Sequence, residues 1–567
     1  MEQLPWLRHY DPGVPPTLKP YPQKTLVDFV DETAAERPDH PFLLFKGARI
    51  SYREVNRLSD AFAAALTARG VRKGDRVAFV LPNSPQLVVA QLGAWKAGAI
   101  AQPVNPLYTQ DELRSVLRMT SPVAVVALTS FYRTVKAAQA QSPVRWVIAT
   151  SIKEHLPPVL RILFTLLKEK KEGHRIDLQP GDVWMQALIH EHAGAPRPAV
   201  NLGADDPALL LCTGGTTGLP KAAVQSHGAL VMTAMQINAW FFRSVPPWTS
   251  THMLVMPLFH TYANSGVLSA AIGGHNAVAL VPNPRDIDDL VHTVKQVQPT
   301  SLPGVPTLYV KLLEHRKVRQ GKVDLRSIRA CLSGAAPLLA ETKRRFEAET
   351  GGRLVEGYAL TESCMAVTCN PLEGLQKLGS IGIPLPDVEV RIVDGETGQR
   401  RLATGEVGEL VMRAPNLMNG YWESPGETKE ALRDGWLYTG DLAYMDEDGY
   451  IFIVDRKKDV IKPSGFQVWP REVEEVVASH PAVMEVAVAG IPDAVQSEAV
   501  KAWVVRKPES SVSEEEIRAF CREKLAAYKV PRQVEFRDAL PKTMIGKVLR
   551  RTLRDEERKA HDSVQPT

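Results

Sequence analysis

Thr213-Gly214-Gly215-Thr216-Thr217-Gly218-Leu219-Pro220-Lys221 is the stretch that most constrains the fold and function of this chain, and it follows an apolar strand predicted at 208–212. Its glycines let the backbone approach a ligand closely, and its hydroxyls and successive N–H groups can cradle phosphate oxygens. The stretch departs from the Walker A pattern because Gly214 and Gly218 are four residues apart and Pro220 precedes Lys221. It predicts a nucleoside triphosphate site; a Gly/Thr-rich turn without a ligand is the alternative.

Short apolar runs alternate with helical stretches on both sides of this loop. Residues 76–81, 123–128, 253–256 and 277–281 have the character of buried strands, and residues 85–96 that of a helix. Strands that alternate with helices form parallel or mixed sheets covered by helices. The sequence therefore predicts the α/β class.

The character of the chain changes toward its C-terminal end. A segment with its own helices and strands begins near Arg456, and Pro470 stands at a plausible first helical position. We expect a large N-terminal domain of mixed sheets covered by helices over residues 1–455. A small α+β C-terminal domain on a hinge is expected over residues 456–567.

Composition excludes several classes of protein. A chain of 567 residues and 62.5 kDa is too long for one compact core. The net charge is only +4, with 68 basic and 64 acidic side chains mixed along the chain, so we expect no nucleic-acid partner. The five cysteines are odd in number and lack CxxC spacing, which favours a reducing compartment. No secretory signal and no run of ~18 apolar residues is visible, so we expect a cytoplasmic location.

Further motifs follow the glycine-rich loop in order. They are Pro-Leu-Phe-His at 257–260, Ser-Gly-Ala-Ala-Pro at 333–337, Glu-Gly-Tyr-Ala-Leu-Thr-Glu at 356–362, Trp-Leu-Tyr-Thr-Gly-Asp at 436–441, Asp-Arg-Lys-Lys-Asp at 455–459, Ser-Gly-Phe at 464–466 and Pro-Lys-Thr-Met-Ile-Gly-Lys at 541–547. The ordered set resembles the adenylate-forming superfamily of acyl- and aryl-CoA synthetases, peptide-synthetase adenylation domains and luciferase. Within it, the chain is similar to bacterial long-chain fatty-acyl-CoA synthetases. It departs from the usual pattern at Cys212, Ala222 and Ala359.

The resemblance implies roles for individual residues. Lys221, Thr361, Glu362 and Lys547 would be catalytic, with Glu362 as the Mg²⁺ ligand because its carboxylate is a hard oxygen donor. Nucleotide and CoA binding would be shared by Thr213, Gly214, Gly215, Thr216, Thr217, Gly218, Lys221, Gly334, Ala335, Ala336, Glu356, Gly357, Tyr358, Thr361, Asp441, Arg456, Lys458, Gly465 and Lys547.

The resemblance also implies a particular role for four of these residues and for one residue near the acyl substrate. The Tyr358 ring can stack on adenine, and Asp441 can accept hydrogen bonds from both ribose hydroxyls. Lys458 matches the hinge position and Gly465 the segment that lines the thiol tunnel. By resemblance His260 lies beside the acyl site; a satisfied loop histidine is an equally good interpretation.

The activity implied is that of an ATP-dependent acyl-CoA ligase. It would activate a fatty acid, with a long chain expected, as acyl-AMP and transfer it to CoA, using Mg²⁺, ATP and CoA and releasing AMP and pyrophosphate. One alternative is an enzyme that loads a carrier protein or uses an aryl or medium-chain acid. An inactive acyl- or nucleotide-binding homologue is the alternative from another class.

An apolar run followed by basic residues occupies positions 155–171. Such a segment can lie at a membrane interface, where free fatty acids partition, or form an insertion helix packed on its own domain or on a second subunit. The sequence alone favours the packed helix. Peripheral membrane contact and a homodimer stay open as partners of the chain.

Overall fold

The computed structural model describes residues 4–213, 221–365, 367–463, 467–493, 497–508, 510–543 and 548–564. Its largest layer is an eight-stranded sheet in the order β18-β9-β8-β4-β3-β5-β6-β7. The strands are β3 (Arg76–Val80), β4 (Ile100–Pro103), β5 (Ala124–Leu128), β6 (Trp146–Thr150), β7 (Val183–Trp184), β8 (Pro207–Thr213), β9 (Lys221–Ser226) and β18 (Gly420–Tyr421). The central strands pair in parallel, and β8 and β9 pair antiparallel. Every residue of β5 and β6 is buried, as a sheet covered on both faces requires.

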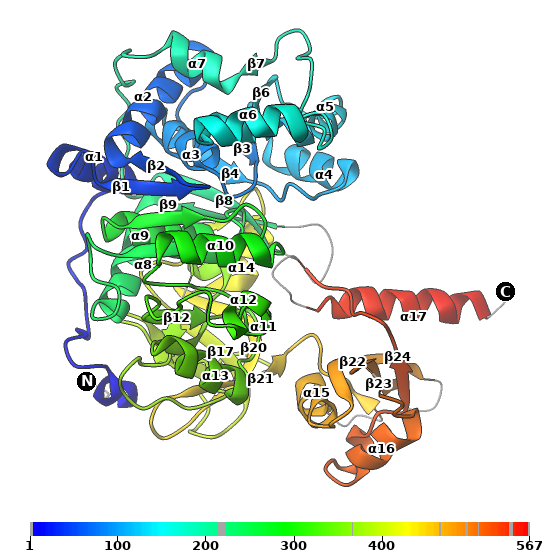
Figure 1. The fold of residues 1–567 in the computed structure, drawn as a ribbon. Coiled ribbons are helices and arrows are strands. Elements are labelled where there is room, and N and C mark those ends of the chain that lie inside the picture. The colour runs from blue at the N-terminus through cyan, green and yellow to red at the C-terminus, as the bar shows by residue number, and fades with distance from the viewer. Residues whose placement is uncertain are drawn as a thin grey trace.

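Helices cover this sheet (Figure 1). They include α1 (Leu26–Glu36), α2 (Tyr52–Ala68), α3 (Pro85–Lys96), α4 (Gln110–Thr120), α5 (Tyr132–Gln139), α6 (Pro158–Leu167), α7 (Met185–Glu191) and α8 (His227–Phe241). All twelve residues of α3 are buried, and the helix begins at Pro85, a residue whose fixed φ suits the first helical turn. This apolar helix is therefore part of the core that holds the sheet in place.

A second layer combines two four-stranded sheets, β10-β11-β1-β2 and β12-β13-β14-β15. Their strands are β1 (Pro41–Phe45), β2 (Ala48–Ser51), β10 (Thr251–Leu254), β11 (Ala277–Leu280), β12 (Ala330–Ser333), β13 (Arg353–Tyr358), β14 (Thr368–Cys369) and β15 (Ile383–Pro384). Single bridges through Ser301 join β10 to β12. Helices α9 (Ser269–Gly273), α10 (Ile287–Val297), α11 (Pro306–Glu314), α12 (Arg316–Arg319) and α13 (Ala340–Thr350) belong to this layer.

A third, antiparallel sheet follows in the chain. It consists of β16 (Glu389–Val393), β17 (Gly408–Arg413), β19 (Leu432–Arg433), β20 (Trp436–Met445) and β21 (Ile451–Arg456), with α14 (Pro425–Ala431) beside it. Asp441 and Arg456 are direct Cα partners across β20 and β21. Two of the predicted nucleotide-binding residues are thus neighbours because of strand register.

The C-terminal segment forms a separate small lobe, drawn in orange to red in Figure 1. It contains α15 (Pro470–Ala478), β22 (Val483–Asp493), β23 (Ser497–Arg506), α16 (Glu514–Arg522), β24 (Gln533–Phe536) and α17 (Arg550–Val564). Pro470 begins α15 as predicted, and Ser513 forms a capping box with Glu516 at the start of α16. The α/β class with a large N-terminal and a small α+β C-terminal domain is confirmed, whereas the boundary at residues 455 and 456 stays a prediction.

The cysteines at all five positions are free. Within the described ranges, no helix combines the length and the apolar composition that a membrane crossing demands.

Candidate active site

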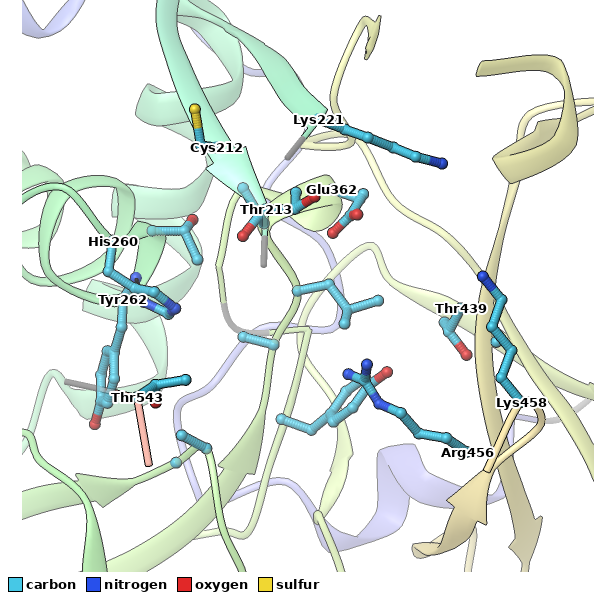
Figure 2. Close-up of a pocket in the computed structure, with 18 of the residues that line it drawn as sticks. Cys212, Thr213, Lys221, His260, Tyr262, Glu362, Thr439, Arg456, Lys458 and Thr543 are labelled. Atoms are coloured by element: carbon cyan, nitrogen blue, oxygen red, sulfur yellow. Dashed lines mark hydrogen bonds between the residues drawn. The ribbon is translucent and has the colours of Figure 1, made fainter. Parts of the chain in front are cut away.

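A cleft of about 1120 Å³ is lined by residues of both lobes. Figure 2 shows side chains of the large domain and of the β21 end gathered around this opening. Of the residues predicted from the sequence, the lining includes Thr213, Lys221, His260, Gly334, Ala335, Ala336, Gly357, Tyr358, Thr361, Glu362, Arg456 and Lys458. The small lobe contributes another group, among them Glu474, Thr543, Val548, Arg550 and Arg554. The two lobes therefore share one site.

The ends of β8 and β9 deliver Thr213 and Lys221, which are Cα partners in this hairpin. The predicted phosphate loop between them, residues 214–218, lies outside the described residues. The Lys221 ammonium is 2.7 Å from a Glu427 carboxylate oxygen and 5.1 Å from the centroid of the Tyr421 ring. An incoming triphosphate would compete with Glu427 for this lysine.

Glu362 lies in a short 3-10 turn, Thr361–Ser363, and is held at several points. Tyr421 donates its hydroxyl hydrogen to Glu362 Oε1 at 2.7 Å, and the Met418 N–H donates to the Glu362 carbonyl at 2.8 Å. Gln225 donates to the carbonyl of Thr361 at 2.8 Å. Burial, followed by the nearby Glu362 charge, raises the pKa of Tyr421 above its usual value, so the phenol stays a donor. Both predicted residues are thus fixed at the cleft wall.

The donor chemistry here fits Mg²⁺. A carboxylate and the hydroxyl-bearing side chains of Thr213 and Thr361 line the same cleft. In the described part of the chain, no three His, Cys, Asp or Glu side chains gather as a metal cage. Mg²⁺ commonly binds one or two carboxylates and takes its other oxygens from substrate phosphates and water. Glu362 would be the protein ligand in such an arrangement.

The segment after β12 forms a flat wall. Ala335 adopts a φ of +68° and, with Ala336, is open to the cleft. A Cβ on Gly357 would lie 2.7 Å from Leu332 Cδ1 and 2.9 Å from the Thr368 carbonyl oxygen, so only glycine fits there. These small residues let a planar group approach the main chain.

Tyr262 supports this wall from beneath. Its hydroxyl donates to the Leu332 carbonyl at 2.6 Å, and a Cβ on Gly334 would lie 3.5 Å from its ring. The sequence interpretation missed Tyr262, because nothing in the pattern at 257–260 signals which later side chain reaches β12.

Tyr358, Asp441 and Arg456 form a connected group. Tyr358 donates its hydroxyl hydrogen to Asp441 Oδ2, and Arg456 Nε lies 3.3 Å from Asp441 Oδ1. The Asp441 side chain is nearly fully buried. The backbone N–H of Asp441 also donates to Thr439 Oγ1 at 3.0 Å. The carboxylate predicted to bind ribose is therefore held between a phenol and a guanidinium.

Glu356 lies in β13 beside the wall. Burial raises the pKa of its carboxyl to about 7, although the Arg471 guanidinium of the small lobe and the Leu338 N–H favour the charged form. Glu356 is not among the residues that line the cleft, and its predicted part in nucleotide binding stays a prediction.

His260 lines the cleft beside Phe259 and Thr261. The Tyr262 N–H donates to His260 Nδ1 at 3.2 Å, which fixes the orientation of the ring. Its place beside an acyl site and any direct role of His260 stay predictions.

The remaining predicted residues concern the hinge and the small domain. Lys458 reaches the cleft, whereas Gly465 and Lys547 lie outside the described residues. Thr543 and Val548, which flank residues 544–547, both line the cleft.

Arg550 is not among the site residues predicted from the sequence. Its guanidinium is 2.6 Å from Glu474 and 3.4 Å from both Asp455 and Asp459. Arg550 therefore ties the start of α17 to the end of β21.

Comparison with known proteins agrees with this geometry. The AMP-binding enzyme family model matches residues 30–422, and the AMP-binding enzyme C-terminal domain model matches residues 472–547. The chain is 39% identical to a long-chain-fatty-acid–CoA ligase of Bacillus subtilis (strain 168), with 99% of each chain covered. It is 38% identical to the enzyme of that name from Escherichia coli O157:H7, with 98% of each covered. The solved structure of ATP-bound MatB from Rhodopseudomonas palustris superposes with a TM-score of 0.80 at 30% identity, covering 94% of this chain and 99% of the other.

Proposed function

The chain belongs to the AMP-binding enzyme family, and from that premise we propose that it is an ATP-dependent ligase that converts a long-chain fatty acid into its CoA thioester. Relatives named long-chain-fatty-acid–CoA ligase match it along nearly its whole length and support this proposal. The observation that carries the proposal is a single cleft lined by Lys221, Glu362, Tyr358 and Arg456 beside the wall at 334–336. Asp441 lies buried between Tyr358 and Arg456.

The first half-reaction joins two anions. A fatty-acid carboxylate oxygen attacks the α-phosphorus of ATP, the bond to the bridging oxygen breaks, and pyrophosphate leaves. Mg²⁺ bound at Glu362 would offset the charge of the phosphates. We propose that Lys221 and Lys547 also offset this charge. The Thr361 hydroxyl would contact the α-phosphate, and Asp441 and Arg456 would bind the ribose.

The second half-reaction uses the mixed anhydride. The CoA sulfur attacks the acyl carbon, its thiol proton is lost, and AMP leaves with the electron pair of the broken C–O bond. We propose that the small domain rotates about the segment at Lys458 between the two steps, so that Lys547 serves the first and the Gly465 segment serves the second. A homodimer and a peripheral membrane contact belong to the same proposal.

The test is a pyrophosphate-release assay on the full chain across acids of about two to twenty carbons, with aryl acids included and CoA present or absent. Each buried methylene contributes ~0.8 kcal/mol to binding until the apolar site is full. We expect the highest rates with long-chain acids, faster turnover with CoA, and AMP as the nucleotide product. Release of ADP and phosphate would refute adenylation, and a preference for acetate or an aryl acid would refute the assigned substrate.

A further inference from the structure

Helix α6 turns an apolar stripe toward solvent. Val159, Ile162, Leu163, Leu166 and Leu167 recur at the spacing of one helical face, and their exposed fractions are 69, 60, 44, 74 and 69%. On a helix that packs against its own domain, such a stripe faces the core. The stripe is therefore not packed on the described part of its own domain, and of the expected partners a second subunit or a membrane surface remains.

The other side of α6 is anchored. Phe164, the buried residue of the helix, packs edge-on against His174 with ring centroids 5.2 Å apart. Arg161 pairs with Glu154 at 3.1 Å. Figure 1 shows α6 on the outside of the N-terminal lobe. The helix is thus attached by one face and presents the opposite face outward.

Exposed basic side chains continue directly from the helix. They are Lys168, Lys170, Lys171 and Arg175. The two acidic residues of this segment are engaged, Glu169 by Lys153 at 2.5 Å and Glu172 by Lys168 at 3.4 Å. Among the described residues, none forms an ion pair with Lys170 or Lys171. The charge of this rim is complementary to anionic lipid headgroups, each basic side chain near such a surface contributing ~1 kcal/mol.

We propose that α6 docks the protein on an anionic phospholipid surface, with the stripe among the acyl chains just below the headgroups and Lys170 and Lys171 at the phosphates. Ten residues of helix are ~15 Å long, about half of the hydrocarbon thickness, so α6 lies along the interface. A second copy of the chain is the other occupant to consider. A stable dimer usually needs ~20–30 residues a side, far more than this stripe offers.

The role of this docking rests on the proposed function. Long-chain fatty acids partition into membranes, so a ligase held at the lipid surface has its substrate at high local concentration. Docking itself depends only on α6 and its basic rim, and can be measured without catalysis.

The experiment is co-sedimentation of the full chain with vesicles of phosphatidylcholine alone or mixed with phosphatidylglycerol. We expect binding to the anionic vesicles that weakens as salt is raised. The pair Ile162→Ser and Leu166→Ser should reduce the partition coefficient by roughly tenfold or more. The pair Lys170→Glu and Lys171→Glu should reduce binding to the anionic vesicles selectively.

The matched control is the pair Leu375→Ser and Leu378→Ser, which removes two similarly exposed leucines elsewhere and should bind as the unmodified chain does. Equal thermal midpoints show that all variants fold.

Absence of vesicle binding, or equal binding by the α6 pair and the unmodified chain, overturns the proposal. A dimer that the α6 pair dissociates, without vesicle binding, assigns the stripe to a second copy and also overturns it. With laurate as the acid and no vesicles, the α6 pair should release pyrophosphate from ATP as fast as the unmodified chain does. If the unmodified chain releases no pyrophosphate, the proposed ligase activity is refuted and the docking result still stands.

Discussion

The phenol of Tyr358 donates a hydrogen bond to the carboxylate of Asp441, although 83 positions separate the two residues in the chain. The register of β20 and β21 places Arg456 on the other carboxylate oxygen. Asp441 is therefore oriented by neighbours that themselves line the cleft. A nucleotide that binds there meets a positioned acceptor.

Asp441→Ala should weaken ATP binding strongly. Two hydrogen bonds from ribose hydroxyls to a charged acceptor are lost, each worth ~1.5–3 kcal/mol, so we expect the dissociation constant to rise by about 100-fold or more. Calorimetric titration with Mg-ATP measures it. Asp39→Ala, an exposed carboxylate paired with Arg53, is the control and should bind normally. Unchanged ATP affinity in folded Asp441→Ala protein would contradict the assignment.

Metal dependence should follow Glu362. Removing Mg²⁺ with a chelator should abolish pyrophosphate release, and added Mg²⁺ should restore it. Glu362→Gln should slow release by ~10²–10³-fold, as loss of a preorganised electrostatic contact does. Tyr421→Phe removes the 2.7 Å hydrogen bond that orients Glu362, so the Mg²⁺ concentration for half-maximal rate should rise. Tyr444→Phe, whose ring stacks on Phe452, should leave this concentration unchanged. Equal Mg²⁺ titrations for all four proteins would exclude Glu362 as the ligand.

Glu356 should make stability depend on pH. The pKa of its carboxyl in the folded protein, about 7, lies above the ordinary value of 4.5, because the fold favours the neutral form. The contribution of this carboxyl to the free energy of unfolding is therefore complete below about pH 4.5 and is lost as pH rises through 7. Glu356→Gln mimics the neutral carboxyl. At about pH 8 the variant should be more stable than the unmodified chain, by at most about 3 kcal/mol. At about pH 5 the two should be nearly equal.

Thermal midpoints at both pH values test the Glu356 prediction, since a chain of two domains gives no single unfolding free energy. A difference between variant and unmodified protein that is the same at both pH values would show that the carboxyl does not titrate in this window.

The sequence predicted much of the fold because several elements carry strong local signals. The predicted helix at 85–96 has the bounds of α3, since an apolar run after Pro85 specifies both its start and its burial. Pro470 likewise begins α15, as its place in the sequence predicts. Local chemistry decides such elements, and the chain supplies it directly.

Contacts between distant segments could not be predicted in this way. Tyr421 reaches Glu362 only because β18 pairs with β9, which depends on tertiary structure. The spacing of Ile162 and Leu166 predicts an apolar stripe, but periodicity does not say whether a stripe faces the core or solvent. Pairings across the hinge, such as Arg550 with Asp455, have no local signal either.

Arg550→Met should destabilise the small domain. The guanidinium offsets the charges of Asp455, Asp459 and Glu474, and burial already raises the pKa of Asp455 and Glu474. Removing one partner from such a buried cluster lowers the free energy of unfolding by roughly 3–5 kcal/mol, because the remaining buried charges lose their partner. The loss in thermal midpoint should be larger at about pH 8 than at about pH 5, where the carboxylates can take up protons.

Arg551→Met is the matched control for this change. Arg551 pairs only weakly with Asp555, at 3.4 Å on an exposed surface, so its replacement should cost ~0–1 kcal/mol. Similar losses for Arg550→Met and Arg551→Met would show that the cluster around Asp455 contributes no specific stabilisation.

Lys547→Ala should separate the two half-reactions. Lys547 lies outside the described residues, and its role near the α-phosphate is a prediction from the resemblance. If Lys547 stabilises the attack of carboxylate on ATP, its removal should slow pyrophosphate release by ~10²–10³-fold. The same variant, given synthetic acyl-adenylate and CoA, should form thioester at a near-normal rate if the small domain rotates between the steps as we propose.

Gly465 supplies the reciprocal variant for the Lys547 prediction. A bulky substitution there should spare pyrophosphate release and block thioester formation, if this segment lines the path of the CoA thiol. Both half-reactions are measured on both variants, in single-turnover assays, so that each protein serves as the control for the other. Opposite patterns require that different faces of the small domain act in the two steps. Equal losses in both steps for Lys547→Ala would mean that the lysine has a structural role or that the domain does not rotate between them.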